Sequence, residues 1–104
     1  MKRKLGYEKG ILQDFESIEG DYPSHVDVIL TRCQGIAADM ECYLKLGEAT
    51  KIHEAPDLYE LYIDGIELEG FYEHQGYRIV YSVSDVSVII IRVHYVPNMN
   101  TVVI

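Results

Sequence analysis

Residues 76–85, Gly-Tyr-Arg-Ile-Val-Tyr-Ser-Val-Ser-Asp, decide the fold together with the apolar run that follows them. Residues 77–83 are rich in aromatic and β-branched side chains, and Ser84-Asp85 is typical of a turn. Residues 86–96 then predict the longest strand, in which Val88–Ile91 are apolar on both faces, as in a central strand covered on each side. Because consecutive strands joined by a short turn pair antiparallel, this stretch predicts the centre of an antiparallel sheet.

Upstream of this stretch the side chains also alternate with the period of two that is typical of strands. Residues 59–63, Tyr-Glu-Leu-Tyr-Ile, predict a strand, and Asp64-Gly65 predicts a hairpin turn. Residues 66–69, Ile-Glu-Leu-Glu, predict a further strand with one buried face and one acidic, solvated face. After a turn at residues 74–76 the chain enters the strand described above. The sequence thus predicts a four-stranded antiparallel meander over about residues 58–96.

The N-terminal part of the chain has a helical period instead. Residues 9–19 place four apolar side chains at helical spacing before Gly20, namely Ile11, Leu12, Phe15 and Ile18. We therefore predict a first helix over about residues 9–19. Residues 4–7, which precede it, are interpreted either as a short first strand or as a frayed terminus.

A second and longer helix is predicted over about residues 24–46. Ser24 opens it as a capping residue, an apolar face repeats along it, and Gly47 closes it. Gly35 lies in its middle, where glycine costs up to about 1 kcal/mol relative to alanine. We therefore expect a close packing contact at Gly35.

The whole chain of 104 residues is expected to form a single domain, because domains commonly run about 100–150 residues. Its predicted class is α+β, with two N-terminal helices packed on the four-stranded meander. Residues 97–104 form a tail that ends in three apolar residues without a charge. Because an exposed apolar end of this kind is an aggregation hazard, we expect the tail to be covered.

The charge of the chain is strongly acidic and unevenly placed. The net charge is −8, and between Lys51 and Arg78 there are seven acidic residues and no Lys or Arg. A nucleic-acid binder normally shows a basic stripe, because the neutralisation of phosphates supplies most of its affinity. The acidic stretch favours a basic or neutral protein partner, and its alternative interpretation is a solvated face that keeps a small domain soluble.

The sequence favours a cytoplasmic protein. No apolar run follows the basic start of the chain, so a signal peptide is not indicated, and no stretch approaches the roughly 20 apolar residues of a membrane span. Cys33 and Cys42 are expected on roughly opposite sides of one helix, about 13 Å apart along its axis, and therefore reduced.

Metal and cofactor chemistry find no support in the sequence. The four histidines are scattered, with no metal-binding spacing and no glycine-rich phosphate loop, so neither a metal nor a cofactor is expected. The antiparallel pairing should bring Arg78 opposite Val93 or one of its neighbours, which places Arg78, Arg92 and His94 at one end of the sheet.

An arginine beside a histidine suits phosphodiester cleavage, since one fixes the phosphate and the other titrates near neutral pH. The alternative is that Arg78 simply pairs with a nearby carboxylate such as Glu60 or Glu73.

Residues 56–63, residues 76–85 and Val88–Ile91 together resemble the RelE/ParE superfamily of bacterial toxins. Members of that superfamily end with a Leu-Tyr-x-Leu strand, a Tyr-Arg-Leu/Ile-Val-Tyr-x-Val-x-Asp strand and an apolar final strand. The match covers roughly residues 50–96, and residues 76–85 are its most specific part. The resemblance implies helices followed by a sheet, an antitoxin partner, and either cleavage of ribosome-bound mRNA or action on gyrase.

Arg78 matches the phosphate-contacting arginine of the family, whereas the lysines of RelE-type toxins fall on Glu60 and Tyr62, which removes that chemistry. Arg92–Tyr95 is similar to the Arg-aromatic-His-Tyr ending of YoeB-type toxins once two residues are deleted from the final strand. That similarity implies a catalytic acid at His94.

The glutamate base of YoeB-type toxins would fall near Glu48. The chain departs from the family by roughly seven extra residues after Gly65 and by nine residues after Tyr95.

Two functions remain open at this point. In the first, the chain is the toxin of a toxin–antitoxin module and cleaves mRNA, with Glu48 as base, Arg78 and Arg92 as phosphate contacts and His94 as acid. In the second, it is an inactive module of the same fold that binds a protein through the acidic surface of residues 54–73. That surface includes Glu60, Glu67, Glu69 and Glu73. A remoter alternative is a homodimer joined through residues 101–104.

Overall fold

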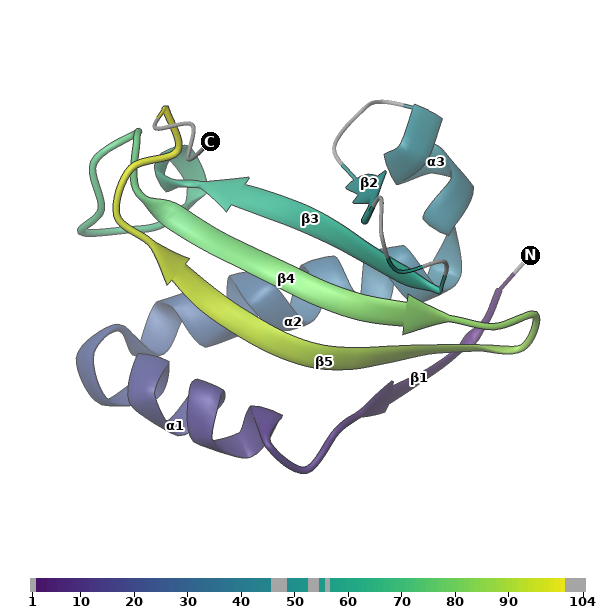
Figure 1. Ribbon diagram of the computed structural model, residues 1–104. Coiled ribbons are helices and arrows are strands. Elements are labelled where there is room, and N and C mark those ends of the chain that lie inside the picture. The colour runs from purple at the N-terminus through teal and green to yellow at the C-terminus, as the bar shows by residue number, and fades with distance from the viewer. Residues whose placement is uncertain (1, 46–48, 53–54, 56, 101–104) are drawn as a thin grey trace.

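A computed structural model describes residues 2–45, 49–52, 55 and 57–100 of the chain. It confirms the α+β class, with N-terminal helices packed on a mostly antiparallel sheet (Figure 1). The helical elements are α1 (Ile11–Asp21), α2 (Pro23–Ala38), α3 (Met40–Lys45) and the short 3₁₀ helix η1 (Gly65–Glu67). The strands are β1 (Lys4–Tyr7), β2 (Ala49–Lys51), β3 (Leu58–Asp64), β4 (Gly76–Val83) and β5 (Ser87–Val96).

The sheet has five strands in the order β1-β5-β4-β3-β2, rather than the four that the sequence predicts. Residues 4–7 are a strand, and β1 pairs parallel with the first half of β5, from Lys4 opposite Ser87 to Tyr7 opposite Ile90. The three residues of β2 add an antiparallel edge beside β3. The sheet is therefore mixed, although β3, β4 and β5 form the predicted antiparallel centre.

The predicted strand at residues 66–69 is wrong. The backbone N–H of Ile66 donates to the Asp64 carboxylate, which caps η1 and turns the chain away from the sheet. β3 pairs directly with β4, with Ile63 opposite Tyr77. Leu68 is buried between two exposed glutamates, but Ile66, which the predicted strand would also bury, is 70% exposed. The segment from Gly65 to Gln75, hereafter the 65–75 loop, joins the two strands.

The predicted long helix over residues 24–46 is interrupted. Asp39 leaves the helical conformation with φ −155° and ψ 74°, and its carboxylate accepts a hydrogen bond from the N–H of Cys42 at 3.2 Å, which starts α3. α2 and α3 are therefore separate helices. The close contact expected at Gly35 is present, because a Cβ there would overlap the side chain of Tyr43 on α3.

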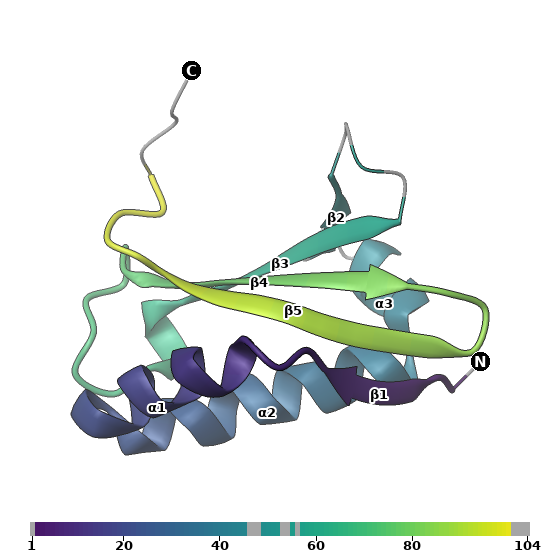
Figure 2. The same cartoon turned by 60° about the horizontal axis from the view of Figure 1, so that its bottom comes forward.

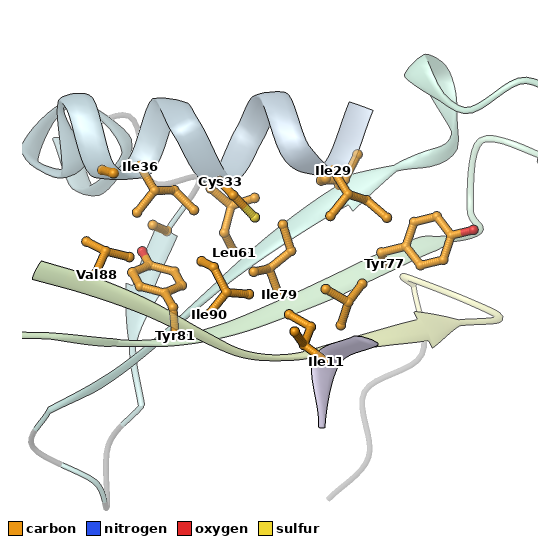
Figure 3. Close-up of a cluster of buried hydrophobic side chains, with 14 of the residues drawn as sticks. Ile11, Ile29, Cys33, Ile36, Leu61, Tyr77, Ile79, Tyr81, Val88 and Ile90 are labelled. Atoms are coloured by element: carbon orange, nitrogen blue, oxygen red, sulfur yellow. The ribbon is translucent and has the colours of Figure 1, made fainter. Parts of the chain in front are cut away.

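The molecule has two layers, in which α1 and α2 cover one face of the sheet and the opposite face carries none of the described helices (Figure 2). The core lies between α2 and the strands, where fully buried side chains meet, among them Ile29, Cys33, Leu61, Ile79, Tyr81 and Ile90 (Figure 3). Burial of an aliphatic side chain of this size contributes about 1.5–3 kcal/mol each. This layer fixes which side chains of β3, β4 and β5 remain on the uncovered face.

Three smaller predictions can be compared with the same structure. Cys33 is buried and Cys42 is exposed, and both are free thiols. Burial is the main reason that the pKa of Cys33 rises to about 12. Within the described residues, no helix has the length and apolar content that a membrane crossing requires. Met99 donates from its N–H to the His74 carbonyl at 2.6 Å, whereas the final residues of the predicted tail, 101–104, lie outside the described residues.

Candidate functional site

Arg78 and His94 lie directly opposite each other on β4 and β5. Tyr62 of β3 lies opposite Arg78 on its other side, so the three residues form one row across the sheet. Side chains in such a row share a face, and this row alternates with Ile79 and Val93, which are buried in the core. The row therefore lies on the face without helices. The predicted position of Arg78, opposite Val93 or one of its neighbours, is confirmed. Tyr77, which precedes Arg78 on β4, is buried in the core.

The Arg78 guanidinium is already paired. Its Nε and Nη2 atoms both lie 2.5 Å from Oε2 of Glu60, which stands one row further along β3. The side chains of Arg78 and Glu60 are 32% and 21% exposed, so the pair is shielded from solvent on several sides. This pairing agrees with the alternative interpretation of the sequence, in which Arg78 pairs with a nearby carboxylate such as Glu60. His94 is half-buried and makes no hydrogen bond to any of the described residues.

Arg92 is also paired, but at the edge of the sheet. Its Nε and Nη2 atoms donate to the two carboxylate oxygens of Asp14 on α1 at 2.9 and 3.1 Å, and the N–H of Val93 donates to the same carboxylate at 3.0 Å. Partial burial by itself raises the pKa of Asp14. The hydrogen bonds from Arg92 and Val93 outweigh that effect and hold the pKa of Asp14 below its ordinary value. A guanidinium that already donates to both oxygens of a carboxylate is a poor ligand for a phosphate.

The acidic residues that the sequence assigns to a partner surface divide into two groups. Glu60 lies on the uncovered sheet face beside Arg78, whereas Glu67, Glu69 and Glu73 belong to the 65–75 loop. Glu67 pairs with Arg32 of α2, and the side chains of Glu69 and Glu73 are exposed. The loop group is therefore the candidate surface for a basic partner. Glu48, the predicted base, lies outside the described residues.

An aromatic cluster that the sequence interpretation missed lies beside this loop. His25 at the start of α2 is fully buried, and its ring stacks on Tyr22 with centroids 4.6 Å apart and an interplanar angle of 3°. Phe71 of the loop meets both rings edge-on, at 4.5 Å from His25 and 4.9 Å from Tyr22. His25 continues the buried stripe of α2 through Ile29, Cys33 and Ile36. This i, i+4, i+8, i+11 spacing is the signal that could have placed it in the core.

The buried His25 ring is hydrogen-bonded at both nitrogens. Nε2 lies 2.7 Å from the carbonyl oxygen of Glu69, and Nδ1 lies 2.8 Å from the Tyr77 hydroxyl. Because a carbonyl only accepts, Nε2 donates, and in the neutral ring Nδ1 accepts the Tyr77 proton. His25 thereby joins α2, the 65–75 loop and β4. Desolvation, followed by the nearby Tyr22, Tyr95 and Asp21, raises the pKa of Tyr77 to about 12, so this hydroxyl keeps its proton at neutral pH.

A cavity of about 370 Å³ opens next to the cluster. The end of α1 contributes Ser17, Ile18 and Asp21 to its wall. The other walls come from the junction of the first two helices, the 65–75 loop and the two long strands, through Tyr22, Phe71, Gln75, Tyr77 and Tyr95. We call this space the aromatic cavity. Gln75 donates from Nε2 to the Tyr95 hydroxyl at 2.7 Å, which fixes the ring on the exposed side of the cavity.

The described residues contain no group of three or more His, Cys, Asp or Glu side chains placed to hold a metal ion. Comparison with protein-family models, with curated proteins and with solved structures finds no match to this chain. What the structure does show is a small α+β protein with N-terminal helices and a five-stranded, mostly antiparallel sheet. Its candidate sites are the paired arginines of the uncovered sheet face and, at the loop end, the acidic 65–75 loop with the aromatic cavity.

Proposed function

We propose that the chain is a protein-binding module that recognises a basic partner through the 65–75 loop. The sequence of residues 50–96 resembles the RelE/ParE toxins, and if the chain belongs to a toxin–antitoxin module, the partner is the antitoxin. One observation carries this proposal. Both arginines in the second half of the chain already form an ion pair with a carboxylate, Arg78 with Glu60 and Arg92 with Asp14.

Charge and position support a basic protein over a nucleic acid. A phosphate backbone would have to displace a carboxylate from each of these arginines, and the net charge of −8 repels it at long range. The 65–75 loop, by contrast, exposes Glu69 and Glu73 without a salt bridge among the described residues. Exposed carboxylates of this kind steer a basic partner towards the surface that carries them.

Charge reversal tests this proposal. The double variant Glu69→Lys/Glu73→Lys is expected to weaken binding of a labelled peptide of alternating arginine and serine by at least about tenfold, because two attractions become repulsions. The matched control Glu8→Lys/Asp85→Lys makes the same change in net charge at two exposed residues outside the loop. Asp85 lies in the turn between β4 and β5, at the opposite end of β4 from the loop (Figure 1).

Fluorescence anisotropy at two salt concentrations is the measurement. Binding should weaken as salt rises, and the control should lose no more than about threefold of the affinity. Equal losses in the two double variants would show that only net charge matters and would remove the loop from the interface.

RNA cleavage is a second candidate, favoured by one observation. Arg78 and His94 face each other on the sheet face that no helix covers, with the Glu60 carboxylate beside them. In this proposal a carboxylate takes the proton of the attacking 2′-hydroxyl. Arg78 binds the phosphate, and His94 gives a proton to the 5′-oxygen that leaves. In this proposal Glu60 is the candidate base among the described residues, and Glu48 remains a prediction.

Growth arrest on expression separates this candidate from the first. Arg78→Ala and His94→Ala should each relieve the arrest, because one removes the phosphate contact and the other the acid, whereas the exposed Lys51→Ala on β2 should leave it unchanged. If all three variants arrest growth as strongly as the unaltered chain, or if the unaltered chain causes no arrest, RNA cleavage is contradicted.

A further inference from the structure

The end of α1 that forms one wall of the aromatic cavity carries uncompensated negative charge. α1 ends at Asp21, its last turn also contains Glu19, and no basic residue lies in that turn. The C-terminus of a helix has a partial negative charge of its own from the aligned peptide dipoles, which normally favours Lys, Arg or His there. The wall therefore carries the negative charge of the Asp21 carboxylate, without a basic residue beside it in the last turn of α1.

The remaining walls of the aromatic cavity also suit a cation. Phe71 lies 5.4 Å from Tyr77 and 5.5 Å from Tyr95, measured between ring centroids, and Tyr77 lies 6.5 Å from Tyr95. Together with Tyr22, which is 4.9 Å from Phe71, these rings make the wall of the cavity largely aromatic, and the π-systems of aromatic rings attract positive charge.

Within the part of the chain that the structure describes, no positive charge balances the negative charge of this cavity. Among the described residues neither Lys nor Arg lines the cavity. Arg92 is held by Asp14, which precedes Asp21 by two helical turns, or about 10 Å along α1. The cavity is thus an acidic and aromatic site that lacks its counter-charge.

We infer that the aromatic cavity binds the ammonium or guanidinium group of a lysine or arginine side chain of a partner protein. A volume of about 370 Å³ is near the lower end of the range for ligand pockets, roughly 300–1,000 Å³, which suits one side chain better than a nucleotide. The choice of a protein side chain over a free organic cation rests on the proposed function, because Phe71 and Gln75 belong to the same loop as Glu69 and Glu73.

The walls are held in place before any ligand arrives. The Tyr77 hydroxyl is hydrogen-bonded to His25, and the Tyr95 hydroxyl accepts a hydrogen bond from Gln75. The Oε1 atom of Gln75 in turn accepts a hydrogen bond from the N–H of Tyr72 at 2.7 Å. A site with fixed walls loses less conformational entropy when it binds. The aromatic cavity therefore needs no rearrangement of these two rings to receive a side chain.

An NMR titration of the full chain with small probes tests this inference. Nα-acetyl-arginine methylamide and Nα-acetyl-lysine methylamide are expected to shift the ring signals of Tyr22, Phe71, Tyr77 and Tyr95 to saturation. The citrulline analogue has the shape of arginine without its charge and should bind at least about threefold more weakly. Tetramethylammonium, which has no side-chain stem, should bind more weakly than the arginine probe.

Two substitutions locate the site. Asp21→Asn and Tyr95→Leu should each weaken binding of the arginine probe by about threefold to tenfold, because one removes the carboxylate and the other a cation-binding ring. Both residues are exposed, and removing a negative charge from the end of α1 favours the helix, so these variants should fold. The matched control Asp85→Asn should leave the affinity for the probe unchanged.

Three results would overturn the inference. They are the absence of saturable shifts with either cationic amino acid, equal binding of arginine and citrulline, and saturation by tetramethylammonium alone. If the probes fail while charge reversal at Glu69 and Glu73 still weakens peptide binding, the cavity is excluded and the proposed function stands. If the probes bind while charge reversal has no effect, the cavity is a cation site and the loop is excluded from the interface.

Discussion

Gly65→Ala is expected to lower the free energy of unfolding by about 3 kcal/mol. A Cβ at this position would lie 1.9 Å from the carbonyl oxygen of Tyr72 and 2.7 Å from its carbonyl carbon. Those atoms belong to the backbone of the 65–75 loop, so they cannot turn aside as the end of a side chain could. The loop would have to move as a unit, and its hydrogen bond from the Gly65 N–H to the Glu73 carbonyl, 3.2 Å long, would be strained or lost.

Chemical denaturation of Gly65→Ala and of Gly20→Ala measures this effect against a matched control. Gly20 lies in α1, and apart from its chain neighbours and the nearby backbone of the helix no described atom lies within 4 Å of the position that a Cβ would take there. Alanine should therefore raise stability by about 0.5–1 kcal/mol through helix propensity. Because the displaced loop forms a wall of the aromatic cavity, Gly65→Ala should also weaken binding of the arginine probe. A Gly65→Ala protein as stable as the unaltered chain would contradict the packing described for the loop.

His25→Leu is expected to cost about 2–4 kcal/mol, although leucine is of similar size and more apolar. The substitution leaves the Tyr77 hydroxyl and the Glu69 carbonyl without the partners they have at 2.8 and 2.7 Å. Each buried polar group that loses its hydrogen bond costs about 1–3 kcal/mol. Equilibrium denaturation is again the measurement, and a loss below about 1 kcal/mol would show that His25 is not needed to join α2, the loop and β4.

A double-mutant cycle separates the hydrogen bond from simple packing. When Tyr77→Phe is added to His25→Leu, the orphaned hydroxyl disappears, so the double variant should be more stable than His25→Leu alone by about 1 kcal/mol. Tyr77→Phe in the unaltered background should instead destabilise, because it leaves Nδ1 of His25 without a donor. Additive effects would mean that the two side chains do not interact.

The sequence predicts the central part of the sheet well because the signal there is local. Residues 77–83 and 86–96 have long runs of strand-forming side chains and a tight turn between them, which sets the register from Val83 opposite Val88 to Tyr81 opposite Ile90. A one-residue register shift between Val80 and Tyr81, which the sequence does not indicate, then brings Arg78 opposite His94 instead of Val93. The four residues of β1, by contrast, pair in parallel with β5, a strand some 80 residues later in the chain. The local sequence of Lys4–Tyr7 does not indicate which strand they pair with.

Two of the predicted elements are wrong, each for a physical reason. Residues 66–69 alternate apolar and acidic side chains, but the 3₁₀ helix at Gly65–Glu67 leaves Ile66 exposed and only Leu68 of the four is buried, so a period of two over four residues does not establish a strand. The helical period of residues 24–46 continues through Asp39, although the Asp39 side chain ends one helix and starts the next by binding the Cys42 N–H.

The candidate sites depend on contacts between residues far apart in the chain. The pairing of Asp14 with Arg92, which neutralises the second arginine, joins an α1 residue to the last strand, and no spacing in the sequence indicates it. The aromatic cavity likewise joins residues 17–22, residues 71–77 and Tyr95, three stretches that lie far apart in the sequence. Only the composition of the loop, rich in acidic and aromatic side chains, hints that this end of the molecule differs from the other.

The most direct test of the central claim is a side-by-side measurement of two affinities. The unaltered chain is titrated, by fluorescence anisotropy at low and at physiological salt, into a labelled arginine–serine peptide and into a labelled single-stranded RNA of equal length. With both arginines of the sheet neutralised by carboxylates, we expect salt-sensitive binding of the peptide and at least about tenfold weaker binding of the RNA. Tighter binding of the RNA than of the peptide would contradict the proposal that this chain recognises a basic protein partner.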